Sequence, residues 1–126
     1  MARLTRISRP KIWPSISPRY LTGCGHIYIH ISYDENKIPI EVFAILGKAG
    51  GCAACQLEGI SRSVTAGLRH GVPAEVYIKQ LAGIKCPSKA IDEGEVIESC
   101  SDAISKAMKF YVDTYLAPVK EAKGET

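Results

Sequence analysis

The chain has 126 residues, 46% of them hydrophobic and 23% charged, with a formal net charge of +3. This length fits one domain with a modest core and leaves little room for a second. The composition is that of a globular domain. A net charge this small gives no support to a nucleic-acid partner, and the longest apolar stretch, residues 42–46, is too short to cross a membrane.

The start of the chain lacks the pattern of a secretory signal peptide, because no long apolar run follows Arg3 and Arg6. We therefore expect a cytoplasmic protein without membrane or nucleic-acid partners, and we leave open whether it self-associates. Five cysteines are present. In a reducing compartment they are expected to be thiols, metal ligands or redox groups rather than structural disulfides.

Residues 1–19 form a basic segment with prolines at positions 10, 14 and 18. Proline lacks a backbone donor and biases the preceding residue towards extended conformations, so the segment predicts an irregular, partly extended arm. The apolar side chains of Ile12, Trp13 and Ile16 suggest that the arm packs on the rest of the protein. We expect the domain itself over residues 20–117 and a flexible tail over residues 118–126.

A β-hairpin is predicted next. Residues 26–31 alternate with a period of two, residues 34–37 have turn composition, and residues 38–46 alternate again. The short turn makes the two strands antiparallel.

Helices follow the hairpin. Leu57, Ile60, Val64 and Leu68 have helical spacing within a predicted helix at about 52–70. A second helix should begin at Pro73 and end at Cys86-Pro87. Residues 88–98 are expected to be a loop with a short strand at 95–97. Ser99 to Asp102 resemble a capping box, which predicts a last helix that stops near Pro118. The fold class is therefore α+β, with an antiparallel hairpin or small sheet packed by about three helices.

Four cysteines stand at predicted turns or helix ends, namely Cys24, Cys52, Cys86 and Cys100. Helix N-termini favour negative charge, so we expect a lowered thiol pKa at Cys52 and Cys100. Thiolates in such places suit a tetrahedral sulfur site for zinc or an iron–sulfur cluster. The alternative is that these cysteines are small buried hydrophobic residues, because metal sites usually contain paired C-x-x-C spacings and these four are scattered singly.

Cys52 and Cys55 form the one close pair. Positions i and i+3 share a helix face, so the pair can also be a redox dithiol. The surrounding strand–loop–helix lacks the parallel βαβ pattern of thioredoxin-like proteins, which favours a role for Cys52 alone.

Several segments together resemble the TSCPD domain found at the C-terminus of vitamin-B12-dependent, class II ribonucleotide reductases. They are Thr22-Gly23-Cys24-Gly25, Ile27-Tyr28-Ile29, residues 39–43, residues 47–53, residues 71–75, residues 78–81, residues 83–88 and Glu98-Ser99-Cys100-Ser101-Asp102-Ala103. The last of these corresponds to the naming motif, with Glu in place of Thr and Ser in place of Pro. The similarity extends from Arg9 to about Met108.

The resemblance implies that the recurring cysteines of the family are those at positions 24, 52, 86 and 100, whereas Cys55 is extra. It thus favours metal ligation by these four, with zinc as the expected ion and a [4Fe–4S] cluster as the alternative. A ribonucleotide reductase or another oxidoreductase subunit is the implied partner.

The resemblance does not confer catalysis, because 126 residues cannot form the large barrel of a reductase. We expect no catalytic residues and a stand-alone metal-binding accessory or interaction module, even where the family label is ribonucleoside-diphosphate reductase. The alternatives are an iron–sulfur electron-transfer subunit and a dithiol protein that uses Cys52 and Cys55.

Overall fold

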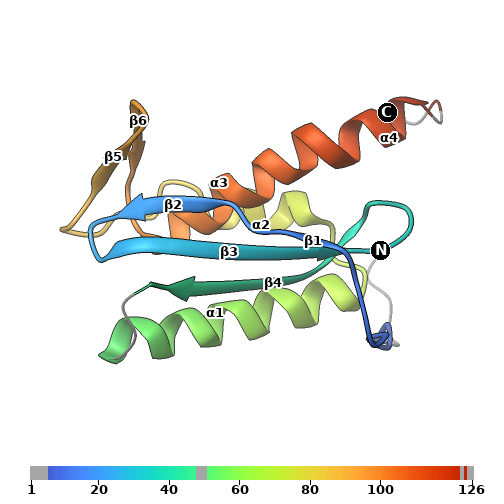
Figure 1. Ribbon diagram of the computed structural model, residues 1–126, viewed down its shortest axis with the longest axis horizontal. Helices are drawn as coiled ribbons and strands as arrows, with labels where there is room; N and C mark the ends of the chain where they lie inside the picture. Colours follow the sequence, from blue (N-terminus) through green and yellow to red (C-terminus); the bar gives the residue numbers. More distant parts are fainter. Residues whose placement is uncertain (1–5, 48–50, 123, 125–126) are drawn as a thin grey trace.

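The computed structural model describes residues 6–47, 51–122 and 124. It contains one layer of β-sheet and one layer of helices, so the α+β fold class is confirmed (Figure 1). The strands are β1 (Ser15–Ile16), β2 (Arg19–Thr22), β3 (Gly25–Tyr33), β4 (Pro39–Leu46), β5 (Ala90–Asp92) and β6 (Glu95–Ile97). The helices are α1 (Gly51–Arg69), α2 (Ala74–Leu81), α3 (Cys100–Tyr111), the π-helical turn η1 (Val112–Leu116) and α4 (Ala117–Ala122). No helix formed by the described residues is long and apolar enough to span a membrane.

The predicted hairpin is confirmed as β3 and β4, which pair antiparallel from Ile27↔Leu46 to Tyr33↔Pro39. Asp34 forms the turn, since its Oδ1 atom accepts the backbone N–H groups of Asn36 and Ile38 at 2.8 and 3.0 Å. This is the usual way in which an aspartate side chain replaces a backbone acceptor in a tight turn.

The other edge of β3 pairs with the end of the basic arm and with the residues that follow it. β1 and β2 both lie antiparallel to β3, one after the other. The residues between β1 and β2 also bond to β3, because the carbonyl of Pro18 accepts the Ile29 N–H at 2.9 Å. Prolines are tolerated here because an edge strand needs only some of its amides. The expected irregular arm therefore contributes the edge of the main sheet.

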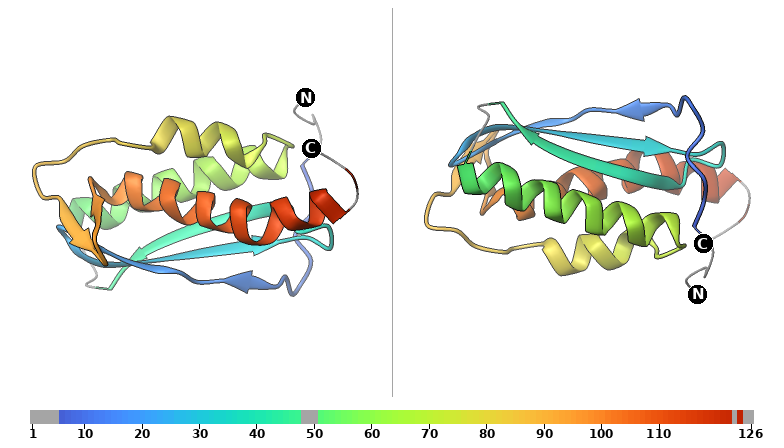
Figure 2. Two further views of the ribbon diagram at one scale, coloured as in Figure 1. Left: turned by 90° about the horizontal axis from the view of Figure 1, so that it is seen from above. Right: turned by 90° about the horizontal axis from the view of Figure 1, so that it is seen from below.

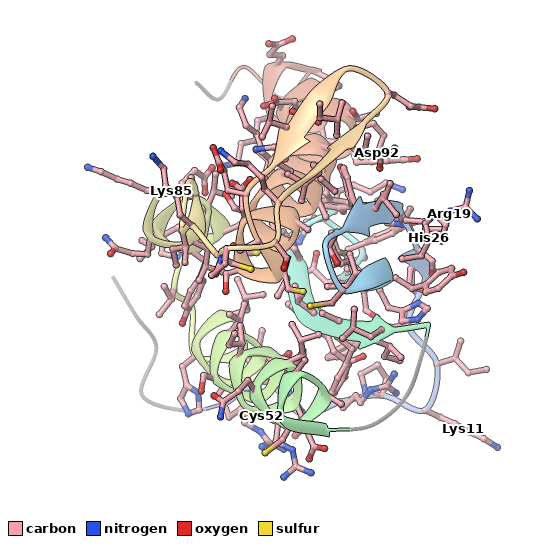
Figure 3. The ribbon with its side chains drawn as sticks, turned by 90° about the vertical axis from the view of Figure 1, so that its left-hand side faces the viewer. Lys11, Arg19, His26, Cys52, Lys85 and Asp92 are labelled. Carbon is pink, nitrogen blue, oxygen red and sulfur yellow. The ribbon has the colours of Figure 1, made fainter. Side chains whose placement is uncertain are left out.

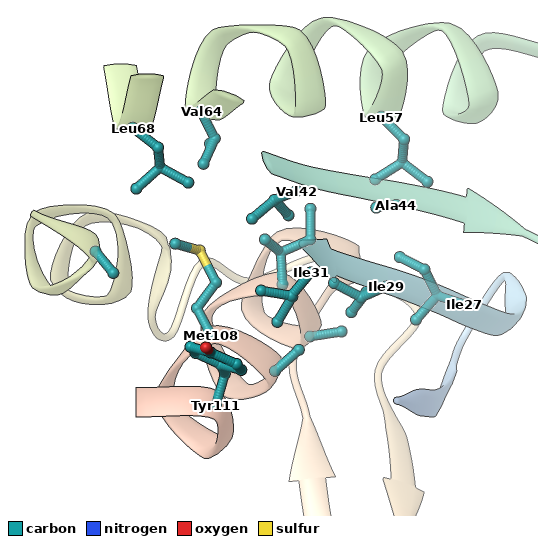
Figure 4. Close-up of a cluster of buried hydrophobic side chains, with 14 of the residues drawn as sticks. Ile27, Ile29, Ile31, Val42, Ala44, Leu57, Val64, Leu68, Met108 and Tyr111 are labelled. Carbon is teal, nitrogen blue, oxygen red and sulfur yellow. The ribbon is translucent and has the colours of Figure 1, made fainter. Parts of the chain in front are cut away.

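The helices cover one face of this sheet (Figure 2). Ile27, Ile29 and Ile31 point from β3 into the core and are 0% exposed. They pack with apolar side chains of β4, α1 and α3, including Val42, Ala44, Leu57, Val64, Leu68, Met108 and Tyr111 (Figure 4). The period-two pattern of the strands and the helical spacing in α1 thus meet in one core.

Side chains of α1 close the outer edge of β4. The Thr65 hydroxyl accepts the Val42 N–H and donates to the Val42 carbonyl, both at 3.0 Å. The Ser61 hydroxyl accepts the Ala44 N–H at 3.0 Å. Buried backbone groups at a sheet edge need such partners, so these contacts fix the helix against the strand.

The second helix is shorter than predicted. α2 ends at Leu81 instead of reaching Cys86, because Ala82 is extended and Gly83 has φ +74°. Apolar spacing alone did not indicate this break. Residues 88–98 contain the expected short strand as β6, and it pairs with the unpredicted β5.

The prediction that the last helix stops near Pro118 is wrong. Its cap at Ser99 is confirmed, but helical structure continues through η1 and α4 to Ala122. Within η1 the register widens, and the Ala117 N–H bonds to the Val112 carbonyl five residues earlier. A π-helical turn just before proline accommodates the missing donor and the bulky ring, so the helix continues past Pro118.

Candidate metal site

The segments that carry the cysteines meet at one end of the molecule. The β2–β3 turn, the loop after α2, and the starts of α1 and α3 all lie at this end (Figure 1). Figure 3 looks directly onto it. The topology therefore explains how thiols that are distant in sequence can come close in space.

Cys24 lies in the β2–β3 turn, which the buried Thr22 organises. The Thr22 hydroxyl donates to the Gly25 carbonyl at 2.7 Å and accepts the Cys24 N–H at 3.1 Å. A threonine that bonds within its own turn fixes the local backbone. The thiol of Cys24 is consequently presented at the surface, where the residue is exposed.

Cys86 lies in a second turn, Cys86-Pro87-Ser88. The backbone N–H of Ser88 donates to the Cys86 Sγ atom at 3.3 Å, while the Cys86 N–H donates to the Glu98 carbonyl at 3.1 Å. Amide hydrogen bonds to sulfur stabilise a thiolate and are a common feature around metal-bound cysteines. The geometry of this turn is therefore compatible with a ligand role.

Cys100 is the first residue of α3. The preceding Ser99 caps the helix, because its hydroxyl accepts the Asp102 N–H at 3.0 Å. The carboxylate of Asp102 accepts the N–H groups of Gly83 and Glu98 at 2.8 and 3.0 Å. The motif that runs from Glu98 to Asp102 thus combines a cap, a thiol and an acceptor for the surrounding loops.

Three of the predicted ligands interact around Cys100. Its thiol donates to the Thr22 hydroxyl (3.8 Å between Sγ and Oγ1), and both Cys24 and Cys86 lie near enough to raise its pKa. The convergence of these three segments is the central geometric feature of the site.

The expectation of a lowered thiol pKa at Cys100 is wrong. Burial raises the pKa of this thiol; the hydrogen bond with Thr22 opposes the increase, and the neighbouring Cys24 and Cys86 add to it. The helix N-terminus does not compensate, since half-burial and adjacent thiols both disfavour a new negative charge. The metal-free Cys100 is therefore a neutral thiol at neutral pH.

Cys52 and Cys55 lie apart from this cluster. Both are exposed on α1, and Figure 3 shows Cys52 on the side of the helix that faces away from the sheet. The turn predicted before Cys52 falls on residues 48–50, outside the described residues. Among the described residues, no group of three or more His, Cys, Asp or Glu side chains is placed so that it could hold a metal ion. Ligation by the four cysteines remains a prediction.

The close approach of the two cysteine turns depends on Gly23. A Cβ atom at this position would overlap the carbonyl oxygen of Ser88. Because that oxygen belongs to the backbone, it cannot move aside easily. Gly23 therefore allows the Cys24 turn to contact the Cys86 turn directly.

Sequence reasoning missed three residues that position the thiols, namely Thr22, Gly23 and Asp102. All three belong to the motifs on which the family resemblance rests, and Asp102 also occupies the last position of the capping box. Their roles depend on contacts between distant segments, which spacing along the chain does not reveal.

Comparison with known proteins gives a family and several relatives. The TSCPD domain family matches residues 5–112. The chain is 29% identical over 96 residues to proteins named vitamin B12-dependent ribonucleotide reductase from Streptantibioticus cattleyicolor, Streptomyces clavuligerus and Streptomyces coelicolor. The aligned region covers 75% of this chain but only 16%, 10% and 10% of those relatives. No solved structure matches the chain significantly.

Proposed function

Because the chain belongs to the TSCPD domain family, we propose that it is a metal-binding accessory module that associates with a ribonucleotide reductase or a related oxidoreductase. The relatives carry that activity in their names, but the chain spans only 10–16% of their length. The similarity therefore supports a part played beside the catalytic machinery and not the reaction itself.

The observation that carries this proposal is the meeting of Cys24, Cys86 and Cys100. These residues come from a β-turn, a loop and a helix start. The Thr22 hydroxyl bonds to both Cys24 and Cys100, and Gly23 packs against the Ser88 backbone of the Cys86 turn. Cysteine thiolates are preferred ligands of Zn²⁺ in structural sites. If these cysteines served only as small buried hydrophobic residues, Cys24 would be buried, but it is exposed.

The donors fit a metal in kind, but they are not preassembled into a coordination shell. Cys24, Cys86 and Cys100 would supply three thiolates, and the Ser88 amide already donates to one of the sulfurs. Cys52 is our candidate for the fourth ligand, because α1 begins at the same end of the molecule (Figure 1). Its side chain faces away from the sheet (Figure 3), so the start of α1 would have to move for Cys52 to join the other three. A bound zinc ion would supply a structural cross-link among these segments, so metal binding would contribute to folding.

The metal proposal is tested by measuring the metal content of anaerobically isolated protein and by titrating the metal-free chain with zinc against a competing chelator. Zinc at one equivalent is expected; iron with inorganic sulfide would instead support the [4Fe–4S] alternative. Cys24→Ser, Cys86→Ser and Cys100→Ser should each weaken zinc binding by at least tenfold, and Cys55→Ser should leave it unchanged. Equal zinc affinity in all four variants would refute the proposed site.

The Cys52→Ser variant distinguishes a site with four cysteine ligands from a site with three. A large loss of zinc affinity would identify Cys52 as the fourth ligand, whereas no loss would restrict the protein ligands to the three converging thiols.

The association is tested separately by size-exclusion chromatography of the chain with a B12-dependent ribonucleotide reductase. Independent elution at micromolar concentrations would argue against that partner.

A dithiol function is the second candidate, favoured by the exposure of Cys52 and Cys55 one helical turn apart on α1. Such a protein would pass reducing equivalents to a partner by thiol–disulfide exchange. Cys55→Ser should then abolish reduction of a disulfide substrate, a result that the metal proposal does not predict.

A further inference from the structure

The thiols of Cys24 and Cys100 are neighbours in the folded chain. Cys24 contributes to the raised pKa of the Cys100 thiol, and both residues use the same hydroxyl group. Thr22 Oγ1 accepts the Cys24 backbone N–H at 3.1 Å and the Cys100 thiol with a sulfur–oxygen separation of 3.8 Å. One buried threonine thus holds the β2–β3 turn against the first turn of α3.

Cys86 differs from this pair in its surroundings. Its sulfur is engaged within its own turn, where Sγ lies 3.3 Å from the Ser88 nitrogen and 3.7 Å from the Ser88 oxygen. Of the three clustered thiols, Cys24 and Cys100 are therefore the two that are best placed to react with each other.

Access to the pair is asymmetric. Cys24 is exposed, whereas Cys100 is partly buried beneath the turn. A reagent from solution therefore reaches Cys24 first, and the sulfur of Cys100 is already in place for the second step. An exposed cysteine beside a resolving cysteine is the arrangement found in reversible thiol oxidation.

We propose that Cys24 and Cys100 are a site of reversible disulfide formation with low-molecular-weight disulfides in the metal-free protein. The Cys24 thiolate, after losing its proton to solvent, attacks one sulfur of the small disulfide and forms a mixed disulfide with release of one small thiolate. The Cys100 sulfur, also deprotonated, then attacks Cys24 Sγ and forms the protein disulfide as the second small thiolate leaves. The two small thiolates take up two protons, so two protein thiols are oxidised and one small disulfide is reduced to two thiols.

This disulfide would exclude two of the proposed zinc ligands, so oxidation and metal binding would be mutually exclusive. That second consequence rests on the proposed function, whereas disulfide formation in the metal-free chain does not. The site would then report the thiol–disulfide balance of its surroundings through its capacity to bind metal.

The experiment uses the full chain, freed of metal with a chelator, incubated with excess oxidised glutathione, and then alkylated and digested with trypsin. Cleavage after Arg19, Lys37, Lys85, Lys89 and Lys106 places Cys24, Cys86 and Cys100 on separate peptides, 20–37, 86–89 and 90–106. Mass spectrometry should find 20–37 linked to 90–106 as the main disulfide product. A dominant link to 86–89, a dominant link within the peptide that carries Cys52 and Cys55, or glutathione adducts alone would overturn the proposal.

Two variants test which cysteines form the disulfide. Cys86→Ser should retain the link between peptides 20–37 and 90–106, and Cys100→Ser should leave Cys24 as a glutathione adduct. Loss of the link in Cys86→Ser would contradict the assigned pair. Circular dichroism of each variant before oxidation verifies that the helices are intact.

A parallel incubation with one equivalent of zinc distinguishes the two proposals. If both are right, zinc should slow formation of the link at least tenfold. A link that forms at the same rate with zinc present would leave the disulfide site standing and overturn the metal site. Zinc binding without any link in the metal-free chain would overturn the disulfide site alone.

Discussion

The carboxylate of Asp102 accepts the backbone N–H of Gly83 at 2.8 Å and so joins the chain after α2 to the first turn of α3. The same carboxylate accepts the Glu98 N–H at 3.0 Å and the Lys106 ammonium at 2.9 Å. The residue is 1% exposed. Asp102 therefore joins the segment just before Cys100 to the loop that follows α2.

Asp102→Asn should destabilise the protein. Asparagine retains one acceptor oxygen but loses the charge, and its amide group would face a backbone donor at the other position. Loss of charge-assisted bonds at a buried site should lower the free energy of unfolding by about 1–3 kcal/mol. Chemical denaturation measures this change. Asp113→Asn is the control, since Asp113 pairs with Lys109 at the surface, and its effect should stay within about 0.5 kcal/mol.

The contribution of Asp102 should depend on pH. Burial raises the pKa of its carboxyl, but the hydrogen bonds from Gly83, Glu98 and Lys106 outweigh burial and hold the pKa below its usual range. A folded-state pKa below the unfolded value stabilises the protein above the unfolded pKa, which is about 4, and this stabilisation is lost as the pH falls through the folded pKa. The stability difference between wild type and Asp102→Asn should therefore narrow below about pH 4. An equal difference at pH 7 and pH 3 would count against this account.

Gly23→Ala should separate the cysteine turns. An added Cβ would overlap the Ser88 backbone, and the required shift should cost about 1–3 kcal/mol of stability. The Cys24–Cys100 link should also form more slowly with oxidised glutathione. Gly59→Ala is the matched control, because a Cβ on this residue of α1 meets nothing within 4 Å. That variant should gain up to about 1 kcal/mol from helix propensity; equal behaviour of the two variants would exclude a packing role for Gly23.

Local patterns along the sequence predicted much of the fold. The alternation of residues 26–31, the Asp34 turn and the Ser99 cap each depend on neighbours within a few positions, and all three are confirmed. The end of α2 could not be predicted in this way. It depends on Gly83, whose amide bonds to Asp102 nineteen residues later.

The candidate site was only partly predictable. Cys24, Cys86 and Cys100 were singled out by their positions at turns and by the family resemblance, and the structure brings them together. The pKa of Cys100 was predicted in the wrong direction, because helix position is visible in the sequence but half-burial beside two thiols is not. The contribution of Thr22 was also missed, since its hydroxyl contacts a cysteine 78 residues away.

The edge of β4 offers a test of how α1 is held in place. Thr65→Val keeps the shape of the side chain but removes the hydroxyl that bonds both Val42 backbone groups. Two buried polar groups would then lack a partner, which should lower the free energy of unfolding by about 1–3 kcal/mol. Ser63→Ala changes an exposed hydroxyl on the same helix and should be neutral or slightly stabilising. Hydrogen exchange at the Val42 amide gives a local readout. Exchange should be faster in Thr65→Val than in Ser63→Ala, because the edge of β4 is bonded by the helix and not by a further strand. Unchanged exchange would show that another group protects this amide.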